Sequence, residues 1–108
     1  MTNFLDYKER VGARADKHYK ATLFESEWLL LGLNCLEPGQ EQHRHRHADQ
    51  DKFYFVLEGE GEFVVGDETR TAGEGVTVWA PAGVPHGVTN RGEGRLTLLV
   101  GIAPAPQA

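Results

Sequence analysis

Residues 75–90 have the sequence GVTVWAPAGVPHGVTN, and this stretch decides the fold. Two short β-type runs flank a turn that contains Pro81, Gly83 and Pro85. Proline fixes the backbone angle φ, and glycine allows the positive φ that many tight turns need. The segment therefore predicts a stiff turn between two strands, and this turn aims the side chain of His86 in a defined direction.

The same alternation of short strands and turns continues in both directions along the chain. Turn signals such as Pro38-Gly39 and Gly66-Asp67 separate the β-type runs, and no long amphipathic helical pattern interrupts them. Short strands spaced by roughly 8–12 residues are typical of an antiparallel sandwich or barrel. The predicted strands cover residues 19–25, 28–36, 42–47, 53–57, 61–65, 69–71, 76–80, 87–90 and 96–102.

Length, charge and cysteine content narrow the class of protein. A chain of 108 residues is the length of one domain. Its 16 acidic and 11 basic side chains give a net charge of −5, which disfavours nucleic acid as a partner. The longest apolar run is far short of the roughly 20 residues that cross a bilayer, so we expect no membrane insertion. Cys35 is the one cysteine, and we expect its thiol to be buried and inert. Because a single cysteine forms no disulfide within the chain and the N-terminus shows no signal-peptide pattern, we expect a cytoplasmic protein.

Three of the five histidines lie in the sequence His43-Arg44-His45-Arg46-His47. In a strand, residues two apart face the same side, so the three imidazoles are predicted to share one face and the two arginines the other. Neighbouring side chains on that face start about 6.5–7 Å apart, which lets two imidazoles lean toward one metal ion. A further ligand must come from elsewhere in the chain, and His86 is the histidine available outside the N-terminal arm.

The spacing around these histidines resembles the two conserved motifs of the cupin superfamily. The resemblance covers residues 35–102, about two-thirds of the chain. The first motif is matched by Gly39, His45, His47 and Gly59. The second motif is matched at every position, by Gly75, Pro81, Gly83, His86 and Asn90.

This resemblance implies an all-β fold, a double-stranded β-helix barrel of the jelly-roll type with a metal ion in the barrel mouth. It also implies that such barrels are often dimeric. The expected organisation is a short N-terminal arm over residues 1–18, a barrel over residues 19–102 and a flexible tail over residues 103–108. The arm is open to three interpretations: a short helix, a loop, or a strand exchanged between the subunits of a dimer.

The resemblance implies that His45, His47 and His86 are metal ligands. The sequence departs from the family pattern at Lys52, which stands seven residues before Gly59, where the first motif usually has a glutamate. A cation there opposes a metal ion, since two like unit charges about 4 Å apart cost about 4 kcal/mol at an effective dielectric of about 20. Imidazole ligands suit Zn, Fe, Ni, Cu and Mn, so the metal itself stays open.

Three arrangements are compatible with this departure. The three histidines bind a metal alone and leave positions open for water and substrate. Alternatively, Asp51 becomes an additional ligand after a one-residue bulge, and His43 is a further candidate. In the third arrangement no metal is bound, and the pocket holds an organic ligand with Lys52 as an anion partner or a Schiff-base amine.

The sequence also predicts where several other residues lie. Lys52 and Tyr54 are expected on the face of the strand that points toward the site, where both are candidate catalytic or ligand-contacting residues. His18, in the polar arm, is expected at the surface. Trp28 and Trp79 are expected in the core, since aromatic side chains dominate small cores.

Two further features suggest structural roles. Asn90 is expected to form structural hydrogen bonds. The strand 53–57 is apolar on both faces, as is the strand 96–102 for most of its length. One small core cannot cover both faces of both strands, so we expect a homodimer.

Two classes of function follow. The first is a metal-dependent enzyme that acts on a small oxygen-bearing organic substrate, with dioxygenase, isomerase or lyase chemistry. The second is a barrel that binds or senses a small molecule without converting it, and without metal if Lys52 excludes one. In both cases the partner is a small molecule, and fold analogy alone does not choose between them.

Overall fold

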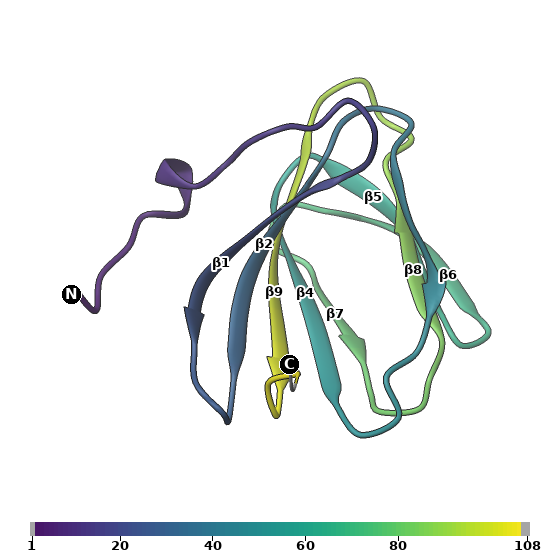
Figure 1. Cartoon of the computed structure of the whole chain (residues 1–108). Helices are drawn as coiled ribbons and strands as arrows, with labels where there is room; N and C mark the ends of the chain where they lie inside the picture. The colour runs from purple at the N-terminus through teal and green to yellow at the C-terminus, as the bar shows by residue number, and fades with distance from the viewer. Residues whose placement is uncertain (1, 107–108) are drawn as a thin grey trace.

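The computed structural model describes residues 2–106 and shows two antiparallel sheets facing each other (Figure 1). One sheet has five strands in the order β1-β2-β9-β4-β7, and the other has four strands in the order β3-β8-β5-β6. This is the predicted all-β jelly roll. The strands are β1 (Tyr19–Glu25), β2 (Leu30–Leu36), β3 (Glu41–His45), β4 (Asp51–Glu58), β5 (Glu60–Val65), β6 (Glu68–Gly73), β7 (Thr77–Ala80), β8 (His86–Thr89) and β9 (Leu96–Ala103).

Side chains with alternating burial explain how the two sheets hold together. In β4, Lys52, Tyr54 and Val56 are buried between the sheets, and the residues between them face outward and are less buried. Because successive side chains of a strand point to opposite faces, each sheet presents one apolar face to the other. The central cluster consists of Leu36, Tyr54, Val56, Phe63, Ala72, Val88, Leu96, Leu98 and Val100.

Gly59 closes the turn between the central strand β4 and β5. Its φ is +79°, and a Cβ atom at this position would lie 2.5 Å from the carbonyl oxygen of Arg95. No side chain fits there without moving the backbone, since non-bonded carbon and oxygen atoms pack beyond about 3 Å. The glycine is therefore required by the close approach of the loop that precedes β9.

The N-terminal arm leaves the barrel, as the purple segment of Figure 1 shows. It contains one 3₁₀ turn, η1 (Tyr7–Glu9), and is otherwise irregular up to β1. Its second half is held against the barrel by the side-chain amide of Gln40, which donates to the carbonyl oxygens of Arg14 and Lys17. Exchange of this arm between subunits stays a prediction.

The chain after β9 packs against the turn between β1 and β2. Ala105 is 7% exposed and its N–H donates to the carbonyl oxygen of Glu27 at 3.2 Å. The predicted tail begins inside β9, at Ala103, and its residues 107 and 108 lie outside the described residues. Within the described chain, no helix is long and apolar enough to cross a membrane.

The prediction that both tryptophans lie in the core is wrong. Trp28 is 73% exposed in the turn between β1 and β2, and Trp79 is 56% exposed on β7. The physical reason for Trp79 is strand alternation: its neighbour Ala80 points inward and is fully buried, so Trp79 points outward. Cys35 and Asn90 are buried as expected, and Asn90 donates to the carbonyl oxygens of Leu36 and Gly94.

Candidate metal centre

Three imidazoles from two distant parts of the chain converge at one end of the barrel. His45 and His86 are paired directly across β3 and β8, and His47 follows two residues after His45, beyond the end of β3. The ring centroids lie 4.5 Å apart for His45 and His86, 5.0 Å for His45 and His47, and 5.7 Å for His47 and His86. One nitrogen atom from each ring lies within 4.8 Å of the other two.

His43 does not belong to this cluster, so the prediction that it shares a face with His45 and His47 is wrong. The pairing of β3 with β8 shifts register between Gln42 and His45, which is a β-bulge. The bulge breaks strict alternation: Gln42 points inward, whereas the His43 side chain is 87% exposed and its Nδ1 lies 3.1 Å from Glu41.

The bulge in β3 depends on Gly87 in β8. A Cβ atom on Gly87 would lie 2.9 Å from the carbonyl oxygen of Gln42 and 3.1 Å from the amide nitrogen of Arg44. Only a residue without a side chain lets the bulged strand come this close to β8. Gly87 follows His86, so this approach sets how His45 and His86 face each other.

Backbone contacts tie the loop that carries His86 to the segment that carries His47. The Gly83 N–H donates to the carbonyl oxygen of His47 at 2.8 Å, and the Ala82 N–H donates to Oδ1 of Asp51 at 2.9 Å. Asp51 is exposed, and its carboxylate lies outside the group of nitrogens described above. The carboxylate of Asp51, a candidate ligand from the sequence, thus contacts the loop before β8 and helps to position it.

Hydrogen bonds orient two of the imidazoles. Nδ1 of His45 lies 2.7 Å from the carbonyl oxygen of His43, and Nδ1 of His86 lies 3.0 Å from that of Val84. A carbonyl accepts only from a protonated nitrogen, so in each neutral ring the proton sits on Nδ1 and the lone pair on Nε2. Such a contact from the second nitrogen of the ring is what orients histidine ligands in metal sites.

The free lone pairs fit a metal ion. Nε2 of His47 and Nε2 of His86 are buried and have no hydrogen-bond partner among the described residues. Two nitrogens that each lie about 2.1 Å from one ion are at most about 4.2 Å apart, so small ring movements bring this cluster within coordinating distance. The three-histidine cluster could therefore hold a metal ion.

Burial keeps these imidazoles neutral, which is the form that binds metal. Desolvation lowers the pKa of His45 and His47, and it lowers the pKa of His86 to about 4. The positive charge of Lys52 lowers all three pKa values further.

Lys52 lies in the same cavity as His45 and His47, in the space between the two sheets. It is 3% exposed, and its Nζ lies 3.4 Å from Oε1 of Gln42 and 4.7 Å from the centre of the Tyr54 ring. Burial lowers the pKa of Lys52 to about 8, and the charge of Lys20 contributes to this shift.

Tyr54 sits beneath Lys52 and is fully buried. Its hydroxyl donates a short hydrogen bond to Oε1 of Gln42, the same oxygen that faces Lys52. Burial raises the pKa of Tyr54. The structure thus places Tyr54 where it holds the Gln42 amide, and its ring supports the Lys52 ammonium by a cation–π contact.

A cavity of about 470 Å³ opens beside the imidazoles and is lined by residues of β1, β2, β9 and β4 in one sheet and of β3 in the other. Lys52, His45, His47 and Gln42 are among the residues that line it. His18 lines it as well: this residue was expected at the surface, but its Nε2 is buried without a partner among the described residues. The local sequence carries no signal for this position, because His18 lies outside β1 and reaches the cavity through the tertiary arrangement.

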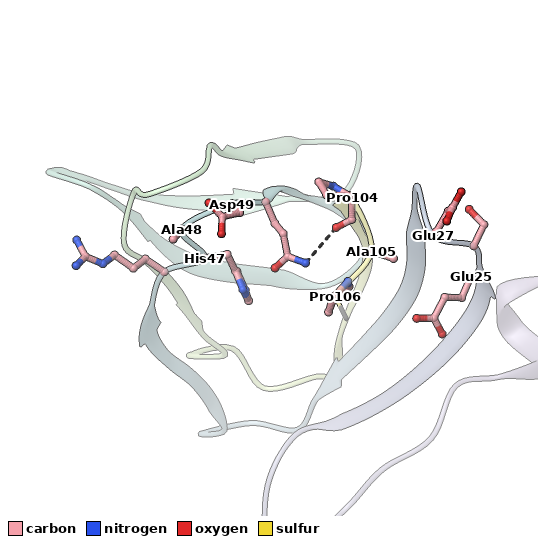
Figure 2. A pocket seen from close by; sticks show the side chains of 11 residues that line it. Glu25, Glu27, His47, Ala48, Asp49, Pro104, Ala105 and Pro106 are labelled. Atoms are coloured by element: carbon pink, nitrogen blue, oxygen red, sulfur yellow. Dashed lines mark hydrogen bonds between the residues drawn. The ribbon is translucent and has the colours of Figure 1, made fainter. Parts of the chain in front are cut away.

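A second hollow adjoins this cavity at His47 (Figure 2). Figure 2 shows Glu25 and Glu27 on one side of it and Asp49 on the other. The side-chain amide of Gln50 donates to the carbonyl oxygen of Pro104 at 3.1 Å. The imidazole of His47 therefore stands between an inner, histidine-lined cavity and an outer hollow with an acidic rim.

Residues 32–102 match the family model of the Cupin domain. No curated protein matches the chain. Among solved structures, the chain is similar to TT1209 from Thermus thermophilus, with 40% identity, a TM-score of 0.93 and coverage of 97% of this chain and 100% of that chain.

Two further structures resemble the chain over nearly its whole length. An RmlC-like cupin protein from Desulfovibrio desulfuricans is 34% identical, with a TM-score of 0.78 and coverage of 96% of this chain and 95% of that chain. A conserved Klebsiella pneumoniae protein with a double-stranded β-helix domain is 21% identical, with a TM-score of 0.92 and coverage of 100% of this chain and 95% of that chain. The last comparison concerns the fold alone.

Proposed function

The chain belongs to the Cupin domain family, and from this premise we propose that it is a metal-dependent enzyme acting on a small oxygen-bearing organic substrate. The observation that carries the proposal is the convergence of His45, His47 and His86, with two buried Nε2 atoms that lack partners among the described residues. Buried polar atoms are nearly always hydrogen-bonded, so two adjacent exceptions indicate a ligand. The reaction class is dioxygenase, isomerase or lyase.

The three histidines would hold a divalent ion, with His45 and His86 each binding through Nε2. When bound, the ion supplies a Lewis-acid centre for an oxygen atom of the substrate. The carbonyl oxygens of His43 and Val84 keep two of the rings in the binding orientation. Three protein ligands leave positions for water and substrate, which a catalytic metal site needs.

Lys52 occupies the place of the usual fourth ligand in the family's first motif, and its environment supports a three-histidine site. The ammonium is directed to Gln42 and stacks over Tyr54. These contacts hold the charge away from a ligand role, and they supply a donor on the substrate side of the cavity.

A second function is favoured by one specific observation, the burial of a lysine beside the three imidazoles. A cation in that place weakens metal binding. In the alternative, the barrel binds or senses a small molecule without metal and without turnover.

Metal analysis distinguishes the metal-dependent enzyme from the metal-free binding barrel. The purified chain is incubated in turn with Mn, Fe, Ni, Cu and Zn, passed through a desalting column and measured by elemental analysis. We expect about one tightly bound ion per chain for at least one metal. Substoichiometric metal with every one of these ions would contradict the metal-dependent enzyme and favour the binding barrel.

Substitutions locate the site. His45→Ala and His86→Ala should each reduce metal occupancy at least about tenfold while the far-ultraviolet circular dichroism spectrum stays unchanged. His43→Ala is the matched control, because this imidazole lies in the same strand but points to solvent, and it should retain full occupancy. Loss of metal in the control alone would show that the ligand assignment is wrong.

A further inference from the structure

The inner cavity has a charge opposite to that of the whole molecule. The chain carries 16 acidic and 11 basic side chains, yet the described residues that line this cavity include Lys20 and Lys52 and no aspartate or glutamate. The imidazoles beside the lysines are neutral or carry a divalent cation, so they add no negative charge. A ligand in this cavity therefore meets a positive potential.

Lys52 has unused hydrogen-bonding capacity. A lysine ammonium has three N–H donors, and Nζ of Lys52 has one acceptor among the described residues, Oε1 of Gln42 at 3.4 Å. At 3% exposure, solvent reaches little of this side chain. A buried charge without full compensation is costly, so the cavity favours an occupant that accepts from this ammonium.

His18 adds a second polar side chain to the lining of this cavity. Its Nε2 is buried, lacks a partner among the described residues, and belongs to a side chain that lines the same cavity as Lys52. A carboxylate has two oxygens that can accept from two donors at once. The ammonium of Lys52 on β4 has N–H donors free for such a group, and the imidazole of His18, which lies just before β1, adds to the polar lining.

The neighbouring hollow limits the charge of the occupant. Glu25, Glu27 and Asp49 line it, with Arg46 as its basic residue. These carboxylates stand at the outer rim, where solvent screens them more than it screens Lys52. They do not cancel the positive inner cavity, but they disfavour a second negative charge on the part of a ligand that extends outward.

We propose that the ligand of the inner cavity is a small organic monoanion whose carboxylate accepts from Lys52. This inference rests on the proposed function for the identity of the site, and it names the chemical class of the substrate. A neutral ligand leaves Lys20 and Lys52 to repel each other across the cavity, and a cation adds to that repulsion.

The test compares glycolate with its neutral isostere glycolamide. Each is titrated into the full chain at about pH 7, below the pKa of about 8 of Lys52, and binding is followed by shifts of backbone amide signals in ¹H–¹⁵N NMR spectra. We expect saturable binding of glycolate at the cavity-lining strands and at least about tenfold weaker binding of glycolamide, the effect of a charged hydrogen bond. Equal affinities, or no saturable shift with glycolate, would overturn the proposal.

Variants assign the effect to Lys52. Lys52→Met keeps an unbranched buried side chain and should weaken glycolate binding at least about tenfold without changing glycolamide binding. The control Lys8→Met removes one charge from η1, outside the cavity, and should leave both affinities unchanged. Equal losses in the two variants would show a general charge effect and overturn the assignment. Because glycolate and glycolamide are first compared on the unaltered chain, a misfolded variant does not remove the test.

The titrations are run on metal-free chain and on metal-loaded chain. Glycolate selectivity that depends on Lys52 in the metal-free chain supports the anion site even if no metal binds. Full metal occupancy with equal affinities for glycolate and glycolamide leaves the proposed metal centre standing and removes the proposed substrate class. The two claims therefore fail separately.

Discussion

A buried ammonium beside three imidazoles makes Lys52 the residue whose replacement says most about the site. Lys52→Glu removes a positive charge and adds a carboxylate oxygen, a ligand type that divalent metals accept. We expect metal affinity at least about tenfold higher than that of the unaltered chain, measured by competition with a chromophoric chelator. Lys52→Met separates the two contributions, because it removes the charge without adding a ligand. Equal affinities for all three proteins would place Lys52 outside the reach of the metal.

The lowered pKa of His86 predicts how the free energy of unfolding of the metal-free chain depends on pH. Burial lowers its pKa from 6.5 to about 4, so the folded state keeps this ring neutral where the unfolded state binds a proton. The contribution of this imidazole to the free energy of unfolding is fully present above about pH 6.5 and is lost as the pH falls toward about 4. His45, His47 and His18, whose pKa values burial also lowers, act in the same direction.

Urea unfolding of the metal-free chain between about pH 7 and pH 4.5 measures this dependence. His86→Gln should flatten the fall in the free energy of unfolding, and His43→Ala, whose ring is exposed, should leave the fall unchanged. A steeper fall in His86→Gln than in the unaltered chain would show that the sign is wrong.

Residue types and spacing predicted His45, His47 and His86, because the two motifs fix positions relative to turns that glycine and proline enforce. Gln42 and His18 were not predicted. Gln42 enters the cavity through the bulge in β3, and alternation alone would have turned it away from His45. His18 comes from a segment without β-strand character, and its role depends on how β1 curls over the cavity, a tertiary property that no local pattern carries.

At the scale of elements, the approach of β3 to β8 determines the geometry of the site. Gly87→Ala would bring a methyl group to 2.9 Å from the Gln42 carbonyl oxygen, so β3 must move away and take His45 with it. We expect a loss of about 1–3 kcal/mol in the free energy of unfolding and weaker metal binding. Gly94→Ala is the control, since nothing lies within 4 Å of its Cβ position. Equal metal affinity for both variants would contradict the role given to the bulge.

The elements themselves were largely predictable, and their ends were not. The run 53–57 identified the central strand, but β4 begins at Asp51, so Lys52 belongs to its regular pairing with β7 and β9. In the other direction, β3 ends at His45 rather than at residue 47, and His47 lies in the following loop. Hydrogen bonds to partner strands set these limits, and partner strands are distant in sequence.

At the scale of the molecule, the outer face of the five-stranded sheet carries apolar side chains. Phe53, Phe55 and Leu99 are half-buried, and Trp79 beside Phe53 is 56% exposed. We expect a homodimer through this face, with a mass by light scattering of about twice the 12.0 kDa of one chain. Trp79→Glu should shift the mass toward a monomer, whereas Arg70→Glu, on the opposite sheet, should not. A monomeric unaltered chain at concentrations of about 100 μM would refute the expectation.

Hydrogen exchange at the Gly83 amide, which donates to the His47 carbonyl oxygen, reports local opening of the site. Proton exchange at this amide requires the loop before β8 to separate from the loop after β3, and that opening pulls His86 away from His47. If His47 and His86 hold a metal ion, the opening would require its release, and its binding free energy would add to the protection of this backbone proton. The exchange rate of the Gly83 amide proton thus measures, without any added probe, how strongly the segment that carries His47 and the segment that carries His86 are held together.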